Sequence, residues 1–225
     1  MISQYPFAAV LFDMDGVVID NTPLHELVWL EFARSHGFNP SEADIRATNG
    51  RRAVDVVISL FGSSLDSDDV VSRLVAEREV LYRQYLTMRN IKAVSGVKSF
   101  LLELGSLDVP RVLATSASFH NVTIVLNRLE LSACFNAIVS AENVCNGKPD
   151  PEVYLTAAKR VEVNPADCLV VEDAVPGMQA AKAAGASCLG ITTSQSEDSL
   201  KQAGADWVAS DFFRLPKPLQ VHSHW

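Results

Sequence analysis

Two pairs of carboxylates in this chain each follow an apolar run of strand length. Asp13 and Asp15 come directly after Ala8–Phe12, and Glu172-Asp173 follows Leu169–Val171. Fully apolar runs of this kind are typical of buried parallel strands, and open α/β sheets bind ligands at the carboxyl ends of such strands. If both strands are central, four carboxylates meet at one edge of the sheet. The alternative for each pair is a surface turn, because Asp and Gly favour turns.

A cluster of four acids cannot stay charged without compensation. Two unit charges about 4 Å apart, at an effective dielectric constant near 20, repel each other by about 4 kcal/mol. The carboxyl groups must therefore be protonated, paired with basic side chains, or neutralised by a hard cation. If a cation neutralises them, a ligand set made only of oxygens favours Mg²⁺ over zinc.

Two further segments have the residue types of an anion site. Thr115-Ser116-Ala117-Ser118 ends an apolar run and leads into a helical pattern, so its hydroxyl and backbone N–H groups could hold a phosphate at a helix N-terminus. The alternative is a simple helix cap. Gly147-Lys148-Pro149-Asp150-Pro151 places Lys148 in a rigid loop before another helix, and the alternative is a solvated lysine. Each segment is weak evidence alone, but these two segments and the two acidic pairs all lie at strand ends or helix starts.

The elements that must position these residues alternate along the second half of the chain. Short apolar runs alternate with helical patterns, which is typical of a parallel sheet covered by helices on both faces. The expected strands are Ala8–Phe12, Arg111–Thr115, Ala137–Ser140, Cys168–Val171, Ser187–Ile191 and Asp206–Ala209. The expected helices are Phe119–Leu129, Pro151–Val161, Pro176–Ala184 and Glu197–Ala203. The fold class is therefore α/β.

Residues 22–92 have a different pattern. Helix-start signals occur at Thr22-Pro23, Pro40-Ser41-Glu42 and Ser67-Asp68-Asp69, and helical spacing extends over Arg51–Phe61 and Val70–Met88. We expect a helical block inserted after the first strand, where it would cover the strand ends. Residues 1–21 and 93–215 would form the core. Residues 216–225 would form an irregular tail, in which His222 and His224 are not expected to be ligands.

The composition restricts the binding partners and the cellular compartment that we expect for this chain. The chain has 225 residues, of which 48% are hydrophobic and 20% charged, with a net charge of −8. This composition is globular, and the negative charge argues against nucleic acid or an anionic membrane as the main partner. The N-terminus does not resemble a signal peptide, and no apolar run approaches the length of a membrane span. The four cysteines contain no Cys-x-x-Cys pair, which indicates neither a disulfide framework nor a zinc site. We expect a cytoplasmic monomer.

Taken together, the four motifs resemble those of the haloacid dehalogenase superfamily. The closest resemblance is to its small-molecule phosphatases and to phosphomutases similar to β-phosphoglucomutase. The motifs are Phe12-Asp13-Met14-Asp15-Gly16-Val17-Val18, Ala114-Thr115-Ser116-Ala117-Ser118, Gly147-Lys148-Pro149-Asp150-Pro151 and Val171-Glu172-Asp173-Ala174. The resemblance covers about residues 7–215. It implies a Rossmann-like parallel-sheet core with a helical cap inserted after the first strand, in agreement with the block at 22–92.

The resemblance also implies a role for each motif residue. Asp13 would be the nucleophile that forms an aspartyl phosphate, and Asp15 the general acid and then the base for the attacking water. The Asp13 and Asp173 carboxylates and the Asp15 carbonyl would hold Mg²⁺, with Glu172 acting directly or through water. The transferring oxygens would be held by Ser116, the backbone at Ala117, and Lys148.

The helical block should select the leaving group. In relatives the segment at Asn49-Gly50-Arg51-Arg52 faces the site, so we expect Arg51 or Arg52 to reach the substrate; a surface pair is the alternative. His25 matches the hinge histidine of the mutases, with an ordinary hydrogen bond as the alternative. The mutases carry a cap lysine where the segment 77–83 here brings an acid.

We therefore predict a Mg²⁺-dependent phosphatase, a phosphoric monoester hydrolase, acting on a small phosphorylated metabolite such as a sugar or polyol phosphate. The alternative is a phosphomutase of the β-phosphoglucomutase type, an intramolecular phosphotransferase. A phospho-accepting receiver module is disfavoured because it is about half this length and has no helical insert. A hydrolytic dehalogenase is disfavoured by Asp15 and by the Glu172-Asp173 pair.

Overall fold

The core of the molecule is a six-stranded sheet in the order β3-β2-β1-β4-β5-β6, in which all neighbouring strands are parallel. The computed structural model describes residues 5–62 and 65–221. The strands are β1 (Ala9–Phe12), β2 (Arg111–Ala114), β3 (Ala137–Val139), β4 (Cys168–Glu172), β5 (Ser187–Ile191) and β6 (Trp207–Ala209). The predicted α/β class and parallel sheet are confirmed.

The two middle strands explain why the acidic motifs meet. β1 lies between β2 and β4, and Phe12 is in register with Val171 of β4. The residues that follow these two strands therefore leave the sheet at the same edge and side by side. In addition, the backbone N–H of Asp13 donates to the carbonyl of Val171 at 3.0 Å, which ties the start of the first motif to β4.

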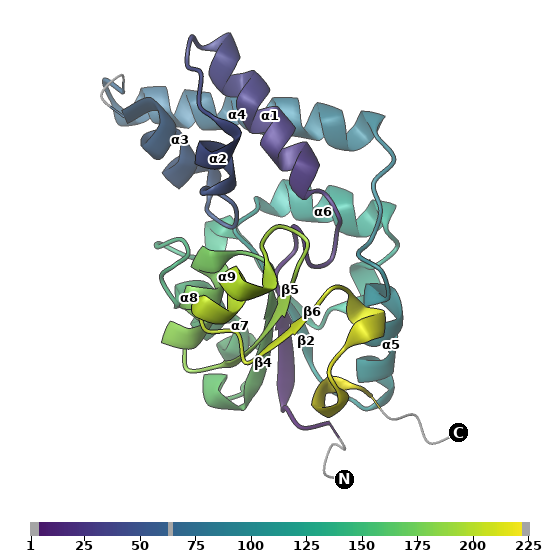
Figure 1. Cartoon of the computed structure of the whole chain (residues 1–225). Helices are drawn as coiled ribbons and strands as arrows, with labels where there is room; N and C mark the ends of the chain where they lie inside the picture. Colours follow the sequence, from purple (N-terminus) through teal and green to yellow (C-terminus); the bar gives the residue numbers. More distant parts are fainter. Residues whose placement is uncertain (1–4, 63–64, 222–225) are drawn as a thin grey trace.

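Helices cover both faces of this sheet (Figure 1). On one face lie α5 (Val97–Ser106) and α6 (Phe119–Arg128); on the other lie α7 (Glu152–Arg160), α8 (Val175–Ala183) and α9 (Glu197–Gln202). The alternation of side chains along β1 serves both faces, because Val10 and Phe12 pack with the first group and Ala9 and Leu11 with the second. Helices α6 to α9 lie where the sequence predicts them, whereas α5 was not predicted.

The insert after the first strand is helical, and its helices form a layer over the carboxyl edge of the sheet (Figure 1). These cap helices are α1 (Thr22–Ser35), α2 (Glu42–Arg46), α3 (Ala53–Phe61) and α4 (Asp68–Met88). They have an apolar cluster of their own, made of Trp29, Phe32, Ile45, Val56, Val57, Phe61 and Leu74. The start signal Thr22-Pro23 implies Thr22 as the N-cap residue of α1, which is wrong by one residue, because Thr22 is the first residue of the helix. The residue before the helix is Asn21, and its side chain makes no capping bond because it turns towards the site described below.

The two chain segments that lead into and out of the cap helices lie against each other. Ile19 and Ala93 form an antiparallel bridge, and the backbone N–H of Asp20 donates to the carbonyl of Lys92 at 2.9 Å. The backbone N–H of Val94 returns a bond to the carbonyl of Val18 at 3.1 Å. This ribbon of paired linkers lies at the predicted boundaries 21/22 and 92/93; the division into domains itself stays a prediction.

The C-terminal segment is more ordered than the sequence indicates. Within the expected irregular tail, Lys217–Leu219 forms a short 3-10 helix, and the Leu219 side chain is completely buried. The Tyr5 hydroxyl donates to the Leu219 carbonyl at 3.4 Å. Leu215 and Leu219 fill the space beside α5, so apolar burial outweighs the two prolines. His222 and His224 lie outside the described residues. In the described ranges, every helix is too short or too polar to cross a membrane.

Candidate active site

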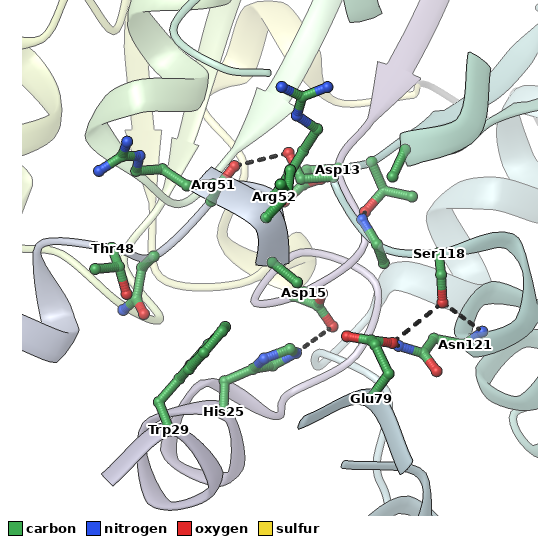
Figure 2. Close-up of a pocket in the computed structure, with 18 of the residues that line it drawn as sticks. Asp13, Asp15, His25, Trp29, Thr48, Arg51, Arg52, Glu79, Ser118 and Asn121 are labelled. Carbon is green, nitrogen blue, oxygen red and sulfur yellow. Dashed lines mark hydrogen bonds and ion pairs between the residues drawn. The ribbon is translucent and has the colours of Figure 1, made fainter. Parts of the chain in front are cut away.

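A cavity of about 230 Å³ lies between the cap helices and the carboxyl edge of the sheet. Its wall includes all the acids that lead out of β1 and β4 except Glu172. Figure 2 shows the side chains that converge on it from both layers. The core contributes Asp13, Asp15, Thr115, Ser116, Ala117, Ser118, Asn121 and Asp173, and the cap helices and their loops contribute His25, Trp29, Thr48, Arg51, Arg52, Arg78 and Glu79.

Three acids form a buried cluster at the base of this cavity. Oxygen atoms of Asp13, Glu172 and Asp173 all lie within 4.8 Å of one another. The cluster forms because β1 and β4 are neighbours in register, so that the residues at their ends cannot avoid one another. The surface-turn alternative is therefore wrong for both acidic motifs.

Gly16 makes room for this cluster. Its φ of +77° is a conformation that residues with a side chain rarely adopt, and a Cβ at this position would lie 1.9 Å from Oδ2 of Asp173. The Gly16 carbonyl also accepts a hydrogen bond from the Thr193 hydroxyl at 2.6 Å. Two features therefore require glycine after the Asp-x-Asp motif: the positive φ angle of the turn, and the Asp173 carboxylate that packs against this position.

Lys148 is completely buried within the acidic cluster. Its ammonium group donates to Oδ1 of Asp13 at 2.9 Å and to Oε1 of Glu172 at 2.6 Å. The alternative of a solvated lysine is therefore wrong. A buried ammonium between two carboxylates is a stable arrangement only when its charge is matched, which the two acids provide.

Glu172 has its carboxylate fully occupied by protein donors. Oε1 accepts from Lys148 and from the Tyr154 hydroxyl, the latter at 2.6 Å, and Oε2 accepts from the backbone N–H groups of Asp173 and Ala174. A Cβ on Gly177 would lie 1.7 Å from Oε1, so the helix start after β4 is shaped around this group. The arrangement favours Glu172 as the anchor of Lys148 and leaves Asp13 and Asp173 as the carboxylates of the cluster that face the cavity.

The electrostatics of the cluster fit a divalent cation. Burial raises the pKa of Asp13 to about 7, against the effect of Lys148 and reinforced by Glu172 and Asp15. Burial, together with Glu172 and Asp13, raises the pKa of Asp173 well above its ordinary value. Three carboxylates share one ammonium, so two negative charges lack a partner. An all-oxygen donor set with this excess charge suits Mg²⁺, which binds once such carboxyls lose their protons.

Asp15 faces the cap helices instead of the cluster. Its Oδ1 accepts a hydrogen bond from the Asn21 amide at 2.5 Å and lies 3.2 Å from Nε2 of His25. Burial alone would raise the pKa of Asp15, but His25 and the hydrogen bond from Asn21 outweigh it, and the pKa lies below its ordinary value. The two aspartates of one motif therefore have opposite environments.

His25 connects Asp15 to the cap helix α4. Its Nδ1 lies 2.8 Å from Nη2 of Arg78. A guanidinium only donates, so Nδ1 must accept, and the ring proton is then on Nε2, which faces Asp15. The buried guanidinium of Arg78 also lies over the rings of Trp29 and Tyr82, 4.4 and 4.7 Å from their centroids. The structure thus places His25 at the wall of the cavity; its match to the hinge histidine of the mutases stays a prediction.

Of the predicted phosphate-binding residues, Ser116 and Ala117 line the cavity, whereas Lys148 lies behind its wall, and all three already have partners within the protein. The Ser116 hydroxyl donates to the carbonyl of Gly50 in the cap at 2.8 Å, and the backbone N–H of Ala117 donates to the Thr115 hydroxyl at 3.1 Å. Ser118 caps α6, since its hydroxyl accepts from the backbone N–H of Asn121. A phosphate that binds here would exchange these internal bonds for its own.

The two predicted cap arginines behave differently from each other. Arg52 is held by Asp55, at 2.9 and 3.1 Å, and by the carbonyl of Cys145 in the core at 2.7 Å. The Arg51 side chain has no hydrogen bond or ion pair with any residue that the structure describes, although its backbone N–H donates to the Thr48 carbonyl at 3.1 Å. Both line the cavity, but in Figure 2 their guanidinium groups point away from Asp15 and His25. That either arginine contacts a substrate stays a prediction.

Several residues of the site are not apparent in the sequence motifs. Arg78, Asn21, Asn121 and Tyr154 hold the acids or line the cavity, yet none lies in a motif with recognisable spacing. One signal was available on α4, because Arg78 lies four residues from both Leu74 and Tyr82, on the apolar stripe of the helix, where a charged side chain needs a buried partner. In the segment 77–83, Glu79 lines the cavity; that it stands where the mutases carry a lysine stays a prediction.

Comparison with known proteins agrees with this architecture. Residues 7–185 match the family model of the haloacid dehalogenase-like hydrolases. The chain is 32% identical over 201 residues to a validoxylamine A 7'-phosphate phosphatase from Streptomyces hygroscopicus subsp. limoneus, covering 88% of this chain and 91% of that protein. It is 30% identical over 190 residues to the fructose-1-phosphate phosphatase YqaB of Escherichia coli, covering 82% and 96%. The crystal structure of a β-phosphoglucomutase from Clostridium difficile superposes with a TM-score of 0.82 at 26% identity, covering 92% of each chain.

Proposed function

The chain belongs to the haloacid dehalogenase-like hydrolases, and from this membership we propose that it hydrolyses a small phosphomonoester, a sugar or polyol phosphate, with Mg²⁺ as cofactor. One observation carries the proposal. Asp13 and Asp15 face the same cavity, but the first lies against Lys148 and the second against His25. Asp13, beside a buried ammonium in the acidic cluster, is positioned to attack a phosphoryl group, and Asp15, outside the cluster on the cap side of the cavity, is positioned to transfer a proton to or from the leaving group.

The first step follows from these positions. A carboxylate oxygen of Asp13 attacks phosphorus, and the bond from phosphorus to the leaving oxygen breaks. Asp15 supplies the proton for that oxygen. It takes up this proton when the anionic substrate enters, because a nearby negative charge raises the pKa of a carboxyl group. The products of this step are the free alcohol and an aspartyl phosphate on Asp13.

The second step returns the enzyme to its starting state. Asp15, now ionised, accepts a proton from water as the water oxygen attacks phosphorus. The bond between phosphorus and Asp13 breaks, which releases inorganic phosphate and restores the carboxylate. The contacts of Asp15 with His25 and Asn21 suit this step, since they favour the ionised form.

The remaining site residues stabilise charge on the transferring group. Lys148 lies on Asp13 and would bind the phosphoryl oxygens with Ser116 and the backbone N–H of Ala117. The Asp13 and Asp173 carboxylates, with the Asp15 carbonyl, would hold Mg²⁺. When bound, the ion offsets the negative charge that Asp13 and the substrate would otherwise bring together. Phosphoryl transfer depends mainly on such positioning and charge stabilisation.

The size and lining of the cavity support a small polar leaving group. About 230 Å³ between the two layers is enough for one compact molecule, and the wall mixes hydroxyl, amide and charged side chains. Two of the relatives described above are named as phosphatases of small phosphorylated compounds. The structural likeness to a β-phosphoglucomutase keeps the phosphomutase as the second candidate.

A panel of phosphorylated sugars and polyols, assayed with Mg²⁺ for both phosphate release and isomer formation, tests the proposal. We expect phosphate release without isomer. If β-glucose 1-phosphate with a catalytic amount of glucose 1,6-bisphosphate gives glucose 6-phosphate faster than free phosphate, the enzyme is a mutase. If neither the panel nor p-nitrophenyl phosphate releases phosphate, the proposed function is wrong.

A further inference from the structure

The start of helix α6 forms part of the cavity wall opposite the cap helix α4. A helix N-terminus presents backbone N–H groups that lack partners within the helix, and such an end commonly binds a phosphate. Here the end is already filled by an acid of the protein. The backbone N–H of Phe119 donates to both carboxylate oxygens of Glu142, each at 3.1 Å, and the N–H of Asn121 donates to the Ser118 hydroxyl.

A second carboxylate reaches the same helix end from the cap. Oε2 of Glu79 accepts hydrogen bonds from the Asn121 amide at 2.6 Å and from the Ser118 hydroxyl at 3.2 Å. Figure 2 shows the Glu79 side chain directed across the cavity at these two residues. The place where a second anionic group of a substrate could bind α6 therefore holds two acids, Glu79 and Glu142.

The cations nearby are engaged. Arg78 donates to Oε1 of Glu79 at 2.8 Å and to His25, and its guanidinium is stacked on aromatic rings. Arg83 lies 3.6 Å from Oε2 of Glu79. A phosphate group entering here would meet two carboxylates, and the two neighbouring arginines already face one of them.

Neutral hydroxyl groups, by contrast, would find partners at this wall. Among the described residues, the buried side-chain polar atoms without a hydrogen bond include Oδ1 of Asn121 and Nε of Arg78. Both residues line the cavity and are at most 2% exposed, so a ligand reaches these two atoms only if the side chains shift towards the cavity. One atom accepts and the other donates, and a hydroxyl can do both. Buried polar atoms normally have a partner, which a ligand hydroxyl would supply after such a shift.

We propose that Glu79, together with Glu142, makes this enzyme selective for substrates with a single phosphate and a neutral polyhydroxy leaving group, and that it rejects bisphosphates. The inference rests on the proposed function and specifies its substrate class. It also gives a physical reason why the mutase reaction, which needs a bound bisphosphate, is disfavoured. The specificity acts through repulsion of the wrong ligand as much as through attraction of the right one.

Binding measurements in the Asp13→Asn background test the inference without turnover. Three pairs serve as probes: fructose 1-phosphate with fructose 1,6-bisphosphate, glucose 6-phosphate with glucose 1,6-bisphosphate, and ribose 5-phosphate with ribose 1,5-bisphosphate. Calorimetry with Mg²⁺ gives the ratio of the two Kd values in each pair. In the pair whose monophosphate binds most tightly, we expect the monophosphate to bind at least about tenfold more tightly than the bisphosphate. We expect Glu79→Gln to reduce this ratio of Kd values at least about fivefold.

Glu77→Gln is the matched control. Glu77 lies on the same helix, is half-exposed, and contacts His36 and Arg73 away from the cavity, so its loss should leave the ratio unchanged. Thermal unfolding checks that both variants are folded. The inference is overturned if no monophosphate binds, if a bisphosphate binds as tightly as its monophosphate, or if both glutamate variants give the same ratio. Hydrolysis of p-nitrophenyl phosphate by the enzyme with Asp13 intact separately decides the proposed function.

Discussion

The ammonium group of Lys148 lies 2.9 Å from Oδ1 of Asp13, although 135 residues separate the two in the chain. The contact exists because Asp13 leaves β1 at the edge where the loop before α7 also ends. It gives the buried Asp13 carboxylate its nearest positive charge. Loss of Lys148 would leave the carboxylates buried without their ammonium partner, which is usually strongly destabilising, whereas loss of the Asp13 charge leaves Lys148 paired with Glu172 at 2.6 Å.

Replacement of Asp13 by Asn should abolish turnover and keep the fold. The amide has nearly the shape of the carboxylate but cannot form the acyl phosphate, so we expect phosphate release to fall by about 1,000-fold or more. The measurement is phosphate release beside a thermal unfolding curve. Asp20→Asn, at an exposed carboxylate in the linker, is the control and should remain active. Substantial activity in Asp13→Asn would mean that the nucleophile is another group.

Removal of Mg²⁺ should destabilise the protein more at alkaline than at acid pH. The pKa of Asp13 rises from an ordinary value near 3.8 to about 7 on folding, and that of Asp173 rises too. The folded apoprotein therefore binds more protons than the unfolded chain between these values, and its stability falls as the pH rises through that window. Because Mg²⁺ replaces those protons, the increase in Tm on adding Mg²⁺ should be larger at pH 8 than at pH 5.5.

The Asp173→Asn variant provides the comparison for the Mg²⁺ experiment. It removes one of the two acids with a raised pKa, so the apoprotein should lose less stability between pH 5.5 and pH 8 and should gain less from Mg²⁺. Equal effects of Mg²⁺ on Tm at the two pH values in the unmodified protein would contradict the assignment of this cluster as the metal site.

Replacement of Gly16 by Ala should disrupt the site, whereas the same replacement at another glycine with positive φ should not. Both Gly16 and Gly37 have positive φ angles, of +77° and +81°, so alanine at either should cost about 1 to 3 kcal/mol in backbone strain. Only at Gly16 would the Cβ collide with Asp173, whereas Gly37 has no atom within 4 Å. Activity and Mg²⁺ affinity should fall in Gly16→Ala and persist in Gly37→Ala. Similar losses in both would point to strain alone.

Removal of the Tyr154 hydroxyl should weaken the support of Lys148. Tyr154→Phe takes one of four donors from the buried Glu172 carboxylate, and a hydrogen bond to a charged group contributes about 1.5 to 3 kcal/mol. We expect a lower Tm and a kcat that falls more than KM changes, because Lys148 acts on the transferring group. Tyr85→Phe removes an exposed hydroxyl bonded to Glu31 and should leave kcat unchanged. Equal kcat values in the two variants would refute this role for Tyr154.

The sequence allowed the core and the acidic cluster to be predicted because both depend on local patterns. Apolar runs identify buried strands, and the polar residues that follow such strands in a parallel sheet share one edge. That is sufficient to bring Asp13 and Asp173 together. Helix α5 was not predicted because no start signal precedes it: the residue before it is Gly96 and its first turn has no acid, although Val97, Leu101 and Leu104 have helical spacing.

The cap side of the site could not be predicted in the same way. The environment of Asp15 depends on how α1 packs against α4, which begin 46 residues apart in the chain, and no local period encodes that contact. The Arg52 side chain is held by the nearby Asp55 and by the distant Cys145 carbonyl, and no local pattern encodes the second contact. The Arg51 side chain has no partner among the described residues. Glu172 anchors Lys148 with the help of Tyr154. The sequence around Tyr154 does not distinguish it from an ordinary aromatic residue of the core.

Because Ile19 and Ala93 pair with each other, the layer of cap helices is attached to the core at essentially one point. Both ends of the helical insert leave the catalytic layer through adjacent, hydrogen-bonded strands, so everything beyond residue 20 and before residue 92 forms a loop whose ends already meet. Another segment whose ends lie as close together could therefore be inserted there without displacing Asp13. On the proposed function, the part of the chain that selects the substrate would be replaceable by recombination or by design, while the residues beneath it stay in place.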